Sequence, residues 1–125
     1  MKTIIATEKA PGAIGPYSQA VKAGNFVFVS GQLPIDPATG AFAGPCIKCQ
    51  TEQSLKNIQA ILESQGLSMK NVVKTTVLLQ NIGDFAAMNG VYATFFTEQM
   101  PARVCYEVAK LPMGAKVEID AIAVK

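Results

Sequence analysis

The chain has 125 residues, half of them hydrophobic and 16% charged, and this length leaves room for a single core, so we expect one domain over residues 1–125. A formal net charge of +2, carried by scattered lysines, indicates neither a nucleic-acid partner nor a polybasic membrane patch. The apolar runs are too short to cross a membrane and no secretory signal pattern opens the sequence, so we expect a cytoplasmic protein without a membrane partner.

The first predicted element is a β-hairpin. Its strands cover residues 19–23 and 26–30, and the pair Gly24-Asn25 between them supplies the positive φ angles that a two-residue turn requires. The second strand carries apolar residues on both of its faces, so both faces are expected to contact protein. A turn follows at residues 36–40.

The middle of the chain predicts two amphipathic helices with a strand between them. Pro45 and Gly66 mark the start and the end of the first helix. Residues 71–80 are rich in β-branched side chains and predict a strand. Asp84 can cap the second helix, whose aromatic stripe is expected to pack in the core rather than to bind a ligand. The apolar stripes are Ile47, Leu55, Ile58, Ile61 and Leu62 in the first helix and Phe85, Met88, Val91, Tyr92, Phe95 and Phe96 in the second.

Two further strands are predicted at residues 102–109 and 117–124, which gives the order ββαβαββ. Right-handed crossovers place both helices on one face of a mixed sheet, so the predicted fold class is α+β. The opposite face of that sheet would expose apolar side chains in a monomer. We therefore expect a closed homo-oligomer.

The chain contains no histidine and three cysteines, which limits its possible chemistry. The lack of histidine excludes histidine-based nucleophile schemes and removes the commonest zinc ligand, so no metal site is predicted. An odd number of cysteines without a secretory signal argues against a disulfide framework. Cys46 and Cys49 form a C-x-x-C pair near a predicted helix start, where a redox role has to be considered. The pair lacks thioredoxin-type neighbours, so its role stays open.

Arg103 lies inside a predicted strand and shares a face with Cys105 and Glu107. If the last two strands form a hairpin, Glu118 and Asp120 of the neighbouring strand lie on that face too. Arg103 could bind a substrate carboxylate through its planar guanidinium, and Glu118 could orient or deprotonate a water molecule. The alternative is a cross-strand ion pair without further function, and the pattern alone does not decide between the two.

Three residues near the first hairpin are weaker candidates for a binding site. Tyr17 could close over a ligand or could anchor its turn by packing. Ser30 and Gly31 end a strand where the main chain could approach a ligand, although Gly31 could equally mark a bulge.

Five segments of the chain together resemble the RidA/YjgF family: GAIGPYSQA, VFVSGQLPIDPATG, QTEQSLKNI, FAAMNGVYATFF and PARVCYEVAKLP. The similarity runs nearly end to end, and the last segment is close to the signature of the family. The resemblance implies a chorismate mutase-like fold. It also implies a homotrimer whose sheets line a central barrel and whose three clefts lie between subunits.

The resemblance further implies an enzyme that hydrolyses 2-imino acids, 2-iminobutanoate and 2-iminopropanoate among them, to 2-keto acids and ammonia without a cofactor. Serine and threonine dehydratases would release the enamines from which these imines form. By the resemblance, Arg103 binds the substrate carboxylate, and Glu118 positions the attacking water together with the main-chain carbonyl of Cys105. The other binding residues matched to the family are Tyr17, Ser30, Gly31 and Asn89.

Two features depart from the family pattern. The link between Phe96 and Pro101 is a few residues shorter than usual, which leaves the preferred imino acid open. The Cys46/Cys49 pair is not a family feature.

Three other functions remain as alternatives: a 2-keto-acid binder or sensor that uses Arg103 without water positioned by Glu118, a ribonuclease, and a chaperone-like holdase. The charge of +2 argues against the ribonuclease, and no sequence feature points to the holdase.

Overall fold

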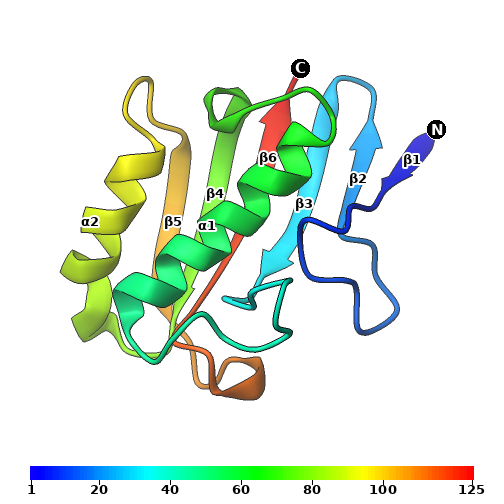
Figure 1. Ribbon diagram of the computed structural model, residues 1–125. Helices are drawn as coiled ribbons and strands as arrows, with labels where there is room; N and C mark the ends of the chain where they lie inside the picture. The colour runs from blue at the N-terminus through cyan, green and yellow to red at the C-terminus, as the bar shows by residue number, and fades with distance from the viewer.

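A six-stranded mixed sheet forms the centre of the computed structural model, which describes residues 1–125. The strands lie in the order β1-β2-β3-β6-β4-β5, and every neighbouring pair is antiparallel except β4 and β5 (Figure 1). The strands are β1 (Lys2–Ile5), β2 (Ala20–Ala23), β3 (Phe26–Gln32), β4 (Val72–Leu79), β5 (Ala102–Glu107) and β6 (Val117–Val124), and the helices are α1 (Ile47–Glu63) and α2 (Phe85–Phe95).

The elements predicted from local patterns are confirmed, with small corrections at their ends. β2 and β3 form the expected hairpin, but only Gly24 takes a positive φ angle, of 60°, and Asn25 does not. The first helix begins two residues after Pro45, and Cys46 is its N-cap residue. Asp84 occupies the N-cap position of the second helix, as predicted, but its side chain makes no capping hydrogen bond.

The predicted pairing of the last two strands is wrong. β4 lies between β5 and β6, so that Thr75 is opposite Arg103 on one side and Ala121 on the other. Parallel strands such as β4 and β5 need a long crossover, here α2, which passes over one face of the sheet. The edge of β4 opposite β5 is therefore open, and β6 pairs there. The order also gains β1, which pairs with β2 and makes the sequence of elements βββαβαββ.

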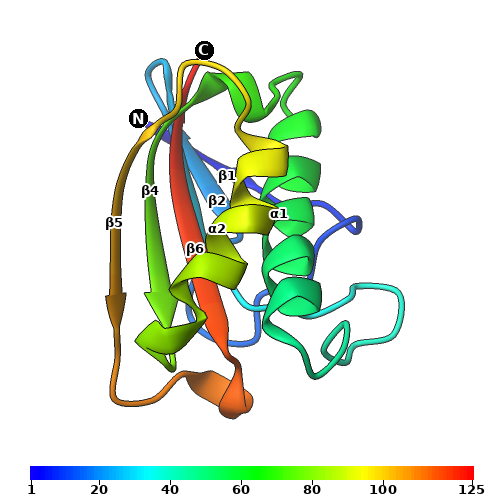
Figure 2. The same cartoon turned by 90° about the vertical axis from the view of Figure 1, so that its left-hand side faces the viewer.

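Both helices cover the same face of the sheet, as predicted (Figure 2). The apolar stripe of α1 is buried against β3 and β6, with Leu55, Ile58, Ile61 and Leu62 all at 0% exposure. Burying side chains of this size stabilises the fold by about 1.5–3 kcal/mol each. The α2 stripe was expected to be core throughout, and this is wrong for Phe85, which is exposed.

The opposite face of the sheet has no cover within the chain (Figure 2). Alternate residues of its strands present large apolar side chains to solvent there: Ile4, Phe26, Phe28, Val104 and Tyr106. This agrees with the exposed apolar face predicted from the sequence. No helix has the length and apolar character that crossing a membrane requires.

The cysteines differ from the expectation of a chain without disulfides. Cys46 and Cys49 are joined by a disulfide, and only Cys105 is a free thiol. The first turn of α1 brings the two Cα atoms to 5.3 Å, within the range that a disulfide bridges. The two cysteines are only three positions apart in the sequence, so the disulfide links no distant parts of the chain.

Candidate functional site

Arg103 lies on β5 under the face of α2 that carries residues 85, 89 and 92, which are neighbours on a helix surface. Its Nη1 donates a hydrogen bond of 2.7 Å to Asn89 Oδ1. Its guanidinium carbon lies 4.8 Å from the centre of the Tyr92 ring and 5.5 Å from that of Phe85, within the range of cation–π attraction. We call Arg103, Asn89, Tyr92, Phe85 and Cys105 the arginine cluster.

The charge of Arg103 is not neutralised within the chain. No carboxylate oxygen lies within 4.0 Å of its guanidinium. The only ion pair within that distance in the chain joins Lys56 to Glu52. Glu107 does share its face, as predicted, but Glu107 instead accepts a hydrogen bond from the main-chain N–H of Ile82. The cross-strand ion pair considered as an alternative is therefore absent.

Two other groups of the arginine cluster titrate at higher pH than usual. Burial raises the pKa of the Tyr92 hydroxyl, whose oxygen also lies 2.7 Å from Thr75 Oγ1 in a buried hydrogen bond. Burial likewise raises the pKa of the Cys105 thiol, although the nearby Arg103 charge acts in the opposite direction. The Cys105 side chain is therefore a neutral thiol at physiological pH and a poor nucleophile.

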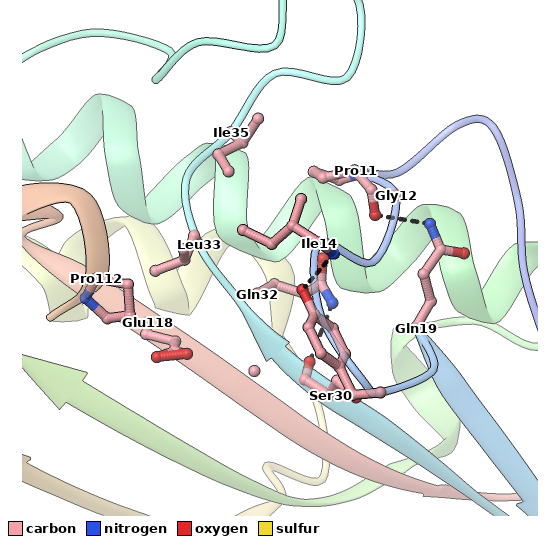
Figure 3. Close-up of a pocket in the computed structure, with 12 residues that line it drawn as sticks. Pro11, Gly12, Ile14, Gln19, Ser30, Gln32, Leu33, Ile35, Pro112 and Glu118 are labelled. Carbon is pink, nitrogen blue, oxygen red and sulfur yellow. Dashed lines mark hydrogen bonds between the residues drawn. The ribbon is translucent and has the colours of Figure 1, made fainter.

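A pocket of about 370 Å³ opens at the end of β3 and the start of β6, a size suited to a small metabolite (Figure 3). Glu118 and Pro112 lie on one side of it, and Ser30 and Ile14 on the other (Figure 3). We call it the carboxylate pocket. Its lining is Pro11, Gly12, Ile14, Tyr17, Gln19, Ser30, Gly31, Gln32, Leu33, Ile35, Pro112 and Glu118.

Gly31 gives the Glu118 carboxylate the space it occupies. A Cβ atom at position 31 would lie 2.6 Å from Glu118 Oε2, so the carboxylate would have to move. The β3–β6 register also shifts between Val29 and Gln32, so Gly31 lies in a bulge as well as at a close approach. Burial raises the pKa of the Glu118 carboxyl, and the negative charge of Asp120 raises it further.

The loop before β2 forms the rim of the carboxylate pocket. Ser30 Oγ donates to the Ser18 carbonyl at 2.6 Å, and Tyr17 Oη accepts from the Ile14 N–H at 3.4 Å. Tyr17 thus anchors its turn while 48% of it stays exposed at the rim. Gln19 was not predicted. Its buried side chain accepts from the Thr7 N–H and donates to three carbonyls, those of Thr7, Ala10 and Pro11.

The structure divides the predicted site residues into two sets. Arg103, Cys105 and Asn89 meet in the arginine cluster, and Tyr17, Ser30, Gly31 and Glu118 meet at the carboxylate pocket. The expectation that Arg103 and Glu118 share a face is wrong: Arg103 pairs in register with Thr75, whereas Glu118 pairs with Leu78, whose side chain points the other way. β4 lies between them, which separates the two strands by about 9.6 Å.

Comparison with known proteins gives a consistent result. The family model described as endoribonuclease L-PSP matches residues 7–125. A RutC family protein of Pyrococcus horikoshii is 57% identical over 125 residues, which cover all of this chain and 99% of that protein. A protein of Salmonella typhimurium named 2-iminobutanoate/2-iminopropanoate deaminase is 52% identical over all of this chain and 99% of its own length. The crystal structure of Escherichia coli TdcF with bound serine superposes with a TM-score of 0.95 at 46% identity and covers 98% of each chain.

Proposed function

Because the chain belongs to the RidA/YjgF family, whose family model is described as endoribonuclease L-PSP, we propose that it hydrolyses 2-iminobutanoate and 2-iminopropanoate to the 2-keto acids and ammonia. The full-length similarity to proteins named for this deaminase activity supports the proposal. Within the structure, the observation that carries it is the unneutralised charge of Arg103.

Arg103 is prepared for an anion from outside the chain. Asn89 holds one of its nitrogens, and the Tyr92 and Phe85 rings lie against the guanidinium, which leaves the other N–H donors free to form a bidentate pair with a carboxylate. No carboxylate of the chain pairs with the guanidinium, so a substrate carboxylate would supply the counter-charge that the chain does not. Both proposed substrates carry such a carboxylate beside the reacting carbon.

Glu118 is proposed to hold the attacking water, together with the main-chain carbonyl of Cys105. The water oxygen bonds to the iminium carbon while the Glu118 carboxylate accepts one water proton, which it then returns to the nitrogen of the resulting carbinolamine. The C–N bond breaks, ammonia leaves with its electron pair, and Glu118 accepts the remaining hydroxyl proton as the carbonyl forms. A raised pKa brings the Glu118 carboxyl closer to the operating pH, which suits a group that must both accept and return a proton. The iminium carbon is already electron-poor, so positioning supplies most of the catalysis.

The proposed site is completed between subunits of a homotrimer. Arg103 and Glu118 lie on opposite faces of one sheet, so a small substrate meets both only where two copies come together. The uncovered face with Phe28, Val104 and Tyr106 is the surface that association would bury, around a central barrel. In this arrangement the arginine cluster of one copy faces the carboxylate pocket of the next, and three such clefts close the ring.

The first experiment is a competition for the imine. A serine or threonine dehydratase supplies the imine, semicarbazide traps it, and keto-acid formation is followed with and without this protein. Wild type is expected to divert imine from semicarbazide, and Arg103→Ala to lose about 100-fold or more in that activity because the substrate carboxylate loses its partner. Arg103→Lys is the matched control, since it keeps the charge and loses the planar fork.

A protein that only binds 2-keto acids would give a different result. Wild type would then leave the semicarbazide reaction unchanged while isothermal titration still detected binding of 2-ketobutyrate, and that binding would survive Glu118→Gln. These two results together would refute the enzyme assignment, while the role of Arg103 in binding the carboxylate would stand.

A mixed oligomer tests the shared site directly. Arg103→Ala and Glu118→Gln chains with different tags are co-expressed and purified through both tags. Each variant alone is expected to be nearly inactive. A mixed trimer contains one cleft with both residues intact, so about a third of wild-type activity should return. Mixed trimers as inactive as their parents would place both residues in one cleft from the same chain.

A further inference from the structure

The Cys46–Cys49 disulfide lies at the N-terminus of the 17-residue helix α1, outside both the arginine cluster and the carboxylate pocket. Cys46 is the N-cap residue, and its sulfur accepts a hydrogen bond of 3.0 Å from the main-chain N–H of Cys49. The first turn of α1 carries no acidic side chain, so nothing there opposes negative charge on that sulfur. A Cys46 thiolate would therefore be stabilised by an N–H donor and by the helix dipole.

The two sulfurs differ in accessibility. Cys46 is exposed, whereas Cys49 is half-buried beneath the main chain at Gly44. A Cβ atom added to Gly44 would lie only 3.3 Å from Cys49 Sγ, which shows how closely that segment covers it. An incoming thiol thus reaches Cys46 more readily than Cys49.

Neither a stabilising nor a metal-binding role accounts for this pair. A disulfide stabilises a fold mainly by restricting the unfolded chain, and this effect is smallest when the closed loop is short, as it is between positions 46 and 49. No group of three or more acidic or cysteine side chains is close enough to hold a metal ion, so the pair has no further ligand.

We propose that Cys46 and Cys49 form a thiol–disulfide exchange site that reacts with small-molecule thiols of the glutathione type. A thiolate attacks Cys46 Sγ, the bond between the two protein sulfurs breaks, and Cys49 leaves with the electron pair and takes up a proton. A second thiolate then attacks the external sulfur of the mixed disulfide and releases the Cys46 thiolate. In sum, one protein disulfide and two thiols give a protein dithiol and one small-molecule disulfide.

This chemistry does not depend on imine hydrolysis. Gln50 follows the pair directly, donates to the Gly44 carbonyl at 2.9 Å and accepts from the Lys116 N–H at 2.8 Å. That buried link holds the helix start without using either cysteine, so the exchange can be measured whether or not the protein acts on imines.

The test uses full-length protein equilibrated in glutathione buffers of varied thiol-to-disulfide ratio. Acid quenching, alkylation and peptide mass spectrometry then give the oxidised fraction at each cysteine. The Cys46/Cys49 pair is expected to pass from disulfide to dithiol as a unit within the range of the buffer series, while Cys105 stays a thiol. A pair that remains fully oxidised, or fully reduced, across the whole series would overturn the proposal.

Single variants identify the attacked sulfur. Cys49→Ser is expected to accumulate a glutathione mixed disulfide on Cys46, because no second thiol resolves it. Cys46→Ser is the matched control and should form an adduct on Cys49 at least about tenfold more slowly. The main chain at Gly44 covers the Cys49 sulfur, and this variant also lacks the sulfur at the N-cap position. Equal rates, or modification at Cys105 alone, would contradict the assignment of Cys46, and melting curves of both variants verify that each is folded.

Discussion

The arginine cluster and the carboxylate pocket hold charges of opposite sign in opposite ways. Arg103 is held by a hydrogen bond from its own nitrogen to Asn89 and by two aromatic rings, none of which carries negative charge. Glu118 has no cation beside it, is partly desolvated and faces another carboxylate, Asp120. The surroundings of Arg103 keep the positive charge in place for an anion, whereas those of Glu118 make the negative charge less favourable. Under the proposed mechanism, the group that binds the substrate and the group that transfers the proton lie on different faces of one sheet.

Of the variants that test this difference between the two sites, Glu118→Gln is expected to have the largest effect on catalysis. The amide keeps the size of the side chain but cannot accept the proton of the attacking water, so kcat should fall by about 100-fold or more while KM changes little. Steady-state kinetics in the dehydratase-coupled assay measure both. A fall in kcat below tenfold would mean that Glu118 is not the base.

The same variant makes a prediction about stability. The folded-state pKa of Glu118 is raised above its unfolded value, so its stabilising effect is fully present below the unfolded pKa and is lost as pH rises through the folded pKa. Glu118→Gln should therefore raise Tm at neutral pH and not at acidic pH. Calorimetry at both values measures the difference.

Gly31→Ala tests whether the Glu118 carboxylate must occupy its present position. The added methyl would lie 2.6 Å from Glu118 Oε2, so the carboxylate has to move. We expect a loss of about 30-fold in kcat/KM, which corresponds to about 2 kcal/mol of displacement cost. Gly90→Ala serves as a control outside the pocket, since position 90 is exposed and no atom lies within 4 Å of the added Cβ. Unchanged kinetics in Gly31→Ala would show that Glu118 can work from another rotamer.

Asn89→Ala should affect the arginine cluster alone. The variant removes the acceptor that orients Arg103, and a hydrogen bond to a charged group contributes about 1.5 kcal/mol, so KM should rise about tenfold with little change in kcat. Asn89→Asp gives the complementary result, because a carboxylate would neutralise Arg103 and weaken substrate binding further. A change confined to kcat would assign Asn89 to the chemical step instead.

Asp120→Asn is the mildest of the four changes. Its negative charge contributes to the raised pKa of Glu118, after burial, so its removal should move the acidic limb of the rate profile to lower pH. The pH dependence of kcat/KM for wild type and variant measures the shift. A movement to higher pH would mean that another group controls that limb.

Local patterns in the sequence were sufficient for most elements. The Gly24 turn, the α1 stripe with Leu55 and Ile58, and the β-branched run of β4 each depend on neighbours in sequence, and the structure has each of them near its predicted bounds. β1 was missed because its four residues form a strand only by pairing with β2.

The geometry of the site depended on contacts that no local pattern contains. Arg103 and Glu118 were both singled out from the sequence, yet their placement on one face followed from assuming that consecutive strands pair. The insertion of β4 between them is a long-range pairing. Gln19 was missed for a related reason, since its partners lie 8 to 12 residues away in an irregular loop and leave no periodic signal.

The four hydrogen bonds of Gln19 also determine when the rim of the carboxylate pocket becomes ordered. Because a buried side chain holds Thr7, Ala10 and Pro11 in place, the conformational entropy of this irregular loop is lost during folding and not when a ligand arrives. A preordered rim spares the ligand that cost, so a molecule with few atoms can still bind usefully. In the proposed function, the rigid rim would also make the pocket selective by shape, since it would exclude larger substrate side chains that a mobile loop would accommodate.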